Sequence, residues 1–82
     1  MNRVVPVAAL EAETMALARR LAEGPTLAYS KAKHLFRQSF DRGLAGQLEA
    51  ERDAFCASTR TRDLGAGAPA FFDWRPPTFE GR

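Results

Sequence analysis

Residues 7–25, VAALEAETMALARRLAEGP, decide the fold class of this chain. A mostly apolar stripe recurs at the spacing of one helical face, formed by Leu10, Thr14, Leu17 and Leu21. The alanines between these positions favour helix. Gly24 and Pro25 end the pattern, because glycine commonly follows a helix and proline cannot continue one. The stretch therefore predicts an amphipathic helix over residues 7–23.

Two more helices are expected downstream, over residues 26–40 and 44–58. The first is TLAYSKAKHLFRQSF, and the Asp-Arg-Gly sequence at 41–43 ends it. A short last helix is expected only over residues 70–74, because Gly65 and Gly67 weaken any earlier start and Pro69 suits a first turn. The expected fold is therefore all-α: a small bundle of three helices, a short C-terminal helix and an extended tail.

The opening segment MNRVVP, residues 1–6, has the character of a strand remnant, since its valines favour extended backbone. No other segment of the chain is predicted as a strand that could pair with it. The expected organisation is a strand remnant over 1–6 and one helical domain over 7–82, with neighbouring structure missing from this chain.

Composition excludes several function classes. The 82 residues carry 12 Lys and Arg against 10 Asp and Glu, a net charge of +2 that does not demand a nucleic-acid partner. Cys56 is the only cysteine, so no disulfide and no Cys/His zinc site is expected. With no signal peptide and no long apolar run, we expect a cytoplasmic protein without membrane contact.

Polar clusters on the predicted helices give weak signals of chemistry. Glu49 and Asp53 bring like charges together without a cleft, and Glu51, on an apolar stripe, is expected to pair with an arginine. Ser30 and His34 could meet on one face, but no acid is in place to orient the histidine. These residues are interpreted as a solvated surface rather than a catalytic centre.

The basic face of the second helix could hold phosphate groups, with a solvated surface as the favoured interpretation. It is formed by Lys31, Lys33, Arg37 and Arg42. Weak nucleic-acid binding there would depend strongly on salt. Among the aromatic residues, Phe71 is expected in the core, whereas Trp74, beside Arg75 at the end of an element, is expected to pack on a ligand or partner.

The run TRTRDLGAGAPAFFDWRPPTFEGR, residues 59–82, resembles the C-terminal signature of the crotonase superfamily, the enoyl-CoA hydratases and isomerases. That signature has the form S-x-D-x-x-E-G-x-x-A-F-x-E-K-R-x-P-x-F-x-G. The matching positions are Asp63, Gly67, Ala70, Phe71, Arg75, Pro77, Phe79 and Gly81. MNRVVP and the Ala/Leu-rich helix that follows it also resemble the family, so the resemblance covers essentially the whole chain.

The resemblance implies that this chain is the C-terminal helical part of a longer enzyme. In the family, an N-terminal part carries two backbone amides that stabilise an enolate, and the C-terminal helices form trimer contacts and cover the acyl-CoA. This chain alone is therefore not expected to catalyse the reaction. Its implied partners are further copies of itself or a missing N-terminal crotonase domain, and acyl-CoA. No cofactor is expected beyond the CoA thioester substrate of the parent enzyme.

Two coenzyme A-binding residues are implied by the resemblance. Phe55 matches the position whose ring lies near the CoA adenine. Trp74 replaces a lysine that usually reaches the CoA phosphates, so stacking on adenine is the alternative use of its indole. Ala66 replaces the usual glutamate, and Pro69 is expected to delay or kink the last helix. The alternative to this family assignment is an independent helical interaction module with no enzymatic role.

Overall fold

The computed structural model describes residues 3–82, and every regular element in that range is a helix. The elements are α1 (Val7–Ala22), α2 (Thr26–Gln38), α3 (Leu44–Ser58) and α4 (Arg62–Phe72), followed by a tail over residues 73–82. The expected all-α class is confirmed. Of the predicted strand remnant, residues 1–2 lie outside the described residues, and residues 3–6 belong to no helix or strand. That this segment derives from a strand stays a prediction.

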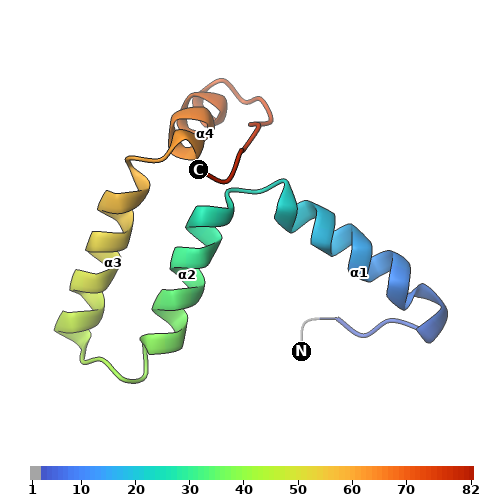
Figure 1. Cartoon of the computed structure of the whole chain (residues 1–82), viewed down its shortest axis with the longest axis horizontal. Coiled ribbons are helices and arrows are strands. Elements are labelled where there is room, and N and C mark those ends of the chain that lie inside the picture. Colours follow the sequence, from blue (N-terminus) through green and yellow to red (C-terminus); the bar gives the residue numbers. More distant parts are fainter. Residues whose placement is uncertain (1–2) are drawn as a thin grey trace.

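The helices form an open arrangement (Figure 1). α2 and α3 run antiparallel as a helical hairpin, α4 lies across one end of it, and α1 extends away from the hairpin. The tail leaves the far end of α4 and returns toward the start of α2. The turn between α2 and α3 is tied by the Arg42 guanidinium, which donates to the side-chain oxygens of Gln38 and Gln47.

Little apolar surface is buried within the chain. Ala70 is the only hydrophobic residue fully buried among residues 3–82. The chain exposes 7078 Å², whereas a compact monomer of 9.0 kDa exposes about 4,850 Å². Its radius of gyration is 16.0 Å, against about 12 Å for a compact domain of this length. The chain therefore exposes roughly 2,200 Å² more surface than a compact monomer of its mass, and its own helices do not cover this surface.

The last helix begins much earlier than the sequence predicts. It covers Arg62–Phe72 rather than residues 70–74, so the prediction that glycines delay its start was wrong. Thr61 caps the helix, because its hydroxyl oxygen accepts a hydrogen bond from the Leu64 N–H at 3.3 Å. Pro69 lies inside the helix but only three residues before its end, so it removes a single backbone hydrogen bond. The cap, together with the hydrogen bonds between Asp63 in the first turn and the tail, favours this early start.

Candidate functional site

The two predicted ligand-binding aromatics are both largely exposed. Phe55 lies in the C-terminal half of α3 with 68% of its surface accessible. Trp74 lies just beyond α4 and is 93% accessible. Trp74 lines a hollow between α4 and the tail, and Phe55 does not line that hollow. The structure therefore leaves both rings free to contact a partner or ligand but does not bring them into one pocket.

The backbone at Trp74 is held in an uncommon conformation. Trp74 has φ +54°, the left-handed region that usually favours glycine. Its N–H donates to the Phe71 carbonyl at 3.3 Å, and the Arg75 N–H donates to the Ala70 carbonyl at 3.0 Å. This pair of bonds is a Schellman motif, which normally has glycine at the position of Trp74. A left-handed tryptophan costs about 1–2 kcal/mol, so the bulky ring is placed here against the local backbone preference.

The hollow beside Trp74 has a volume of about 440 Å³ and an aromatic and cationic lining. Phe71 of α4 lines it together with Trp74, Arg75 and Phe79 of the tail. Phe71 was expected in the core, and that expectation was wrong: 73% of its surface is exposed. The reason is that no described helix packs closely over this end of α4 (Figure 1), where the Phe71 ring lies edge to face with Phe72 at a centroid distance of 5.6 Å.

The tail is fastened to the start of α4 by Asp63. One carboxylate oxygen of Asp63 accepts the Glu80 N–H at 2.7 Å, and the other accepts the Gly81 N–H at 2.9 Å. In return the Asp63 N–H donates to the Arg82 carbonyl at 3.0 Å. The side chain is 5% exposed, and both of its oxygens have partners. Such charge-assisted bonds to a buried carboxylate are about twice as strong as neutral ones.

Two glycines allow the tail to approach the helices closely. A Cβ at Gly67 would lie 3.2 Å from the Phe79 ring, so the absent side chain makes room for that ring. Gly81 has φ +76°, and a Cβ there would lie 2.5 Å from the Thr26 hydroxyl oxygen at the start of α2. Phe79 thereby reaches a mainly apolar cavity of about 230 Å³, which is also lined by Leu27 and Leu64. The tail joins α4 to α2 through this cavity.

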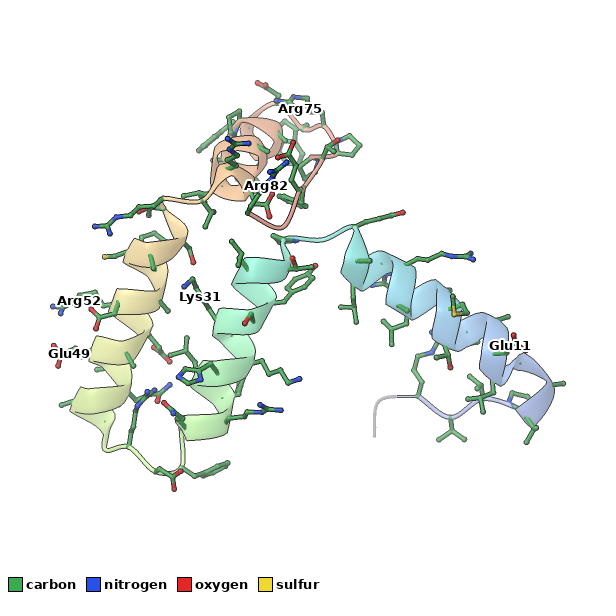
Figure 2. The ribbon with its side chains drawn as sticks, viewed as in Figure 1. Glu11, Lys31, Glu49, Arg52, Arg75 and Arg82 are labelled. Atoms are coloured by element: carbon green, nitrogen blue, oxygen red, sulfur yellow. The ribbon has the colours of Figure 1, made fainter. Side chains whose placement is uncertain are left out.

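A separate groove of about 500 Å³ lies between α2 and α3, with polar side chains in its lining. Ser30 and His34 both line it, and Asp53 of α3 lies in the same groove. Within residues 3–82 no hydrogen bond links these three side chains, so they do not form a catalytic triad. Lys31 extends from α2 into the space between the two helices (Figure 2). Arg42, in the turn between them, also lines the groove. The groove is therefore lined by the basic side chains of Lys31 and Arg42, but no further feature indicates which ligand they would bind.

Arg52 pairs with two of the carboxylates of α3. Arg52 bridges Glu49 at 3.3 Å and Asp53 at 3.5 Å, and Glu49 and Arg52 point away from α2 (Figure 2). Glu51 was expected to pair with an arginine, but it accepts a hydrogen bond from Gln47 at 3.4 Å instead. The arginine next to it has already paired with the other two carboxylates. These exposed ion pairs contribute little stability, as is usual at a surface.

No three His, Cys, Asp or Glu side chains within residues 3–82 are grouped closely enough to hold a metal ion. None of the described helices has the length and apolar character needed to cross a bilayer.

The fold and the tail arrangement agree with one known family. The family model described as enoyl-CoA hydratase/isomerase matches residues 1–82. The chain belongs to this family. Its relatives include the 2,3-dehydroadipyl-CoA hydratase of Escherichia coli K12, 38% identical over 66 residues, which are 80% of this chain and 26% of that protein. A probable enoyl-CoA hydratase of Rhodobacter capsulatus is 33% identical over 78 residues, 95% of this chain and 30% of that protein.

Solved structures support the same assignment. An enoyl-CoA hydrates subunit I from Geobacillus kaustophilus superimposes on all of this chain with a TM-score of 0.92 and 38% identity. A second enoyl-CoA hydrates structure from the same organism gives a TM-score of 0.90 at 29% identity. This chain spans 32% and 31% of those two chains. It therefore corresponds to about a third of an enoyl-CoA hydratase-like protein, and the alternative of an unrelated helical module is not supported.

Sequence reasoning missed the most highly connected residue of the site. Asp63 was identified only as a matching position of the family signature, and its partners lie 17 and 18 residues away. The available signal was Gly81 near the end of the chain, because a glycine after an aromatic tail suggests a left-handed residue in a close contact. Nothing in the local sequence indicates which side chain accepts the tail amides.

Proposed function

We propose that this chain contributes self-association and part of an acyl-CoA lid to an enoyl-CoA hydratase/isomerase-like protein, and that it lacks the catalytic core. The observation that carries the proposal is the excess of roughly 2,200 Å² of exposed surface over a compact monomer. Interfaces of permanently associated chains bury areas of this order. Trimer-type contacts with further copies, or contact with an N-terminal crotonase domain, would supply the missing cover.

The acyl-CoA part of the proposal rests on Trp74 and Phe55. Both rings are exposed, and Arg75 lies beside Trp74 in the same hollow. An indole can stack on the adenine ring, while a neighbouring guanidinium can pair with phosphate oxygens. The left-handed backbone at Trp74 also favours a functional role, because glycine would be the less strained residue there.

Binding of coenzyme A tests the lid. We expect CoA to quench the fluorescence of Trp74, the only tryptophan. Calorimetry should show that Trp74→Gly weakens CoA binding by about tenfold, since base–aromatic stacking contributes about 1–3 kcal/mol. Glycine relieves the left-handed strain, so the helix content of this variant should not fall. Phe40→Ala is a matched control, because Phe40 is an exposed aromatic at the far end of α2. Equal CoA affinity in the Trp74→Gly variant would contradict the lid.

The absence of the catalytic core is tested by turnover. We expect purified residues 1–82 to hydrate crotonyl-CoA no faster than buffer does. The reason is that the reaction needs an oxyanion hole of backbone amides, and the resemblance assigns that element to the part of the family's fold outside this chain. Ultraviolet absorbance of the enoyl thioester follows the reaction directly. Measurable turnover that survives removal of trace contaminating enzymes would overturn this part of the proposal.

A further inference from the structure

The tail is attached to α4 at both ends of the helix. At the C-terminal end, the Schellman motif turns the chain at Trp74 and Arg75. At the N-terminal end, Asp63 holds the backbone of Glu80 and Gly81. Figure 1 shows the tail leaving one end of α4 and coming back to the other. Residues 74–79 therefore form a loop whose two ends are both fixed to one helix.

Asp63 differs in burial and in hydrogen bonding from an ordinary acidic residue in the first turn of a helix. Such an acid stabilises the helix through the macrodipole and normally stays in water. Asp63 is 5% exposed, and each of its oxygens accepts one of two successive tail N–H groups. Successive N–H groups at a turn with a positive φ form a concave anion-binding site. The tail therefore supplies the binding site, and the Asp63 carboxylate is the anion that occupies it.

We propose that Asp63 is a positioning residue that holds the 74–79 loop closed and thereby fixes the indole of Trp74 at the lid. The chain of contacts is short. Asp63 fixes Glu80 and Gly81, the adjoining Phe79 then lies over Gly67, and Phe79 lines the same hollow as Trp74. The role in the lid rests on the proposed function, whereas closure of the loop can be tested without any ligand.

A graded set of substitutions tests the proposal in the full chain. Asp63→Ala removes both acceptors, and Asp63→Asn keeps one acceptor while turning a donor toward the other N–H. Gly81→Ala leaves the carboxylate in place but adds a Cβ at φ +76°, 2.5 Å from the Thr26 hydroxyl. Asp41→Asn is the control. Asp41 is an exposed acid in the turn between α2 and α3, and its substitution removes the same charge as Asp63→Asn without touching the tail.

Two ligand-free readouts measure loop closure. We call the two hydrogen bonds from the Glu80 and Gly81 amides to the Asp63 carboxylate the latch. Hydrogen exchange of these two amides reports whether the latch is closed, and time-resolved fluorescence anisotropy reports the motion of the Trp74 indole. In the native chain we expect protected amides and a slow-moving indole. Asp63→Ala and Gly81→Ala should each raise amide exchange at least tenfold and free the indole, with Asp63→Asn between them and the native chain. Circular dichroism should show that α1, α2 and α3 keep their helix content in every variant.

Several results would overturn the proposal. Random-coil exchange of the Glu80 and Gly81 amides in the native chain would mean that no latch exists. Unchanged indole motion in Asp63→Ala would mean that the latch does not position Trp74, and so would an equal effect of Asp41→Asn. CoA titration separates this inference from the proposed function. If the native chain does not bind CoA but Asp63→Ala frees the indole, the lid fails and the latch stands. If CoA binds equally well to Asp63→Ala, the positioning role fails and the lid stands.

Discussion

On hundredfold dilution, the chain is expected to lose thermal stability, with its midpoint falling on the order of 5–10 °C. The physical reason is the shortage of buried apolar surface within one copy, in which Ala70 is the only fully buried hydrophobic residue of the described part. A chain of 82 residues has a small stability margin even when compact. If association supplies the missing burial, stability depends on protein concentration.

The measurement is a set of thermal melts by far-ultraviolet circular dichroism over a range of concentrations, with sedimentation velocity at each one. We expect the midpoint and the sedimentation coefficient to fall together. A midpoint independent of concentration, in a species that sediments as a monomer with sharp aromatic circular dichroism, would contradict the proposed self-association. That result would leave the N-terminal crotonase domain as the only proposed source of cover.

The helices that were predicted well are those with strong local signals. α1 begins at Val7 as expected and ends within one residue of the predicted end. α3 has the predicted bounds, Leu44–Ser58, because its apolar positions, its alanines and the glycine before it all favour the same helix. α2 ends two residues early, where the Ser39 hydroxyl bonds the Phe36 carbonyl and a turn begins. Such ends depend on side-chain contacts that the periodicity does not contain.

The errors concern features decided by distant contacts. Whether Phe71 is buried depends on what packs over its end of α4, and within the described residues 73% of its surface stays exposed. The long α4 and its latch depend on Asp63 meeting backbone groups 17 and 18 residues later. Composition and helical period describe neighbours three or four residues apart, so they cannot locate such a contact. Family resemblance marked Asp63 and Gly81 as matching positions without giving the bond between them.

Replacing Phe71 and Phe72 together by glutamate is expected to weaken self-association roughly a hundredfold or more. The two rings are adjacent at the end of α4, with 73% and 76% of their surfaces exposed. Burying a phenylalanine fully in a partner contributes about 1.5–3 kcal/mol, and two buried carboxylates would add a desolvation cost. If a partner covers this surface, the combined loss is on the order of 3 kcal/mol, which corresponds to about a hundredfold in affinity.

The control is the pair Ala45→Glu and Gly46→Glu, which adds the same two charges at exposed positions in the first turn of α3. A Cβ at Gly46 meets nothing within 4 Å, and negative charge is favourable near a helix N-terminus. Sedimentation equilibrium should therefore give the control pair a native association constant and the Phe71/Phe72 variant a much weaker one. Because the Phe71 and Phe72 side chains are mostly in water in the single copy, their replacement costs little within one chain. Equal association of the two variants would place the covered surface elsewhere, on the exposed apolar faces of α1 and α3.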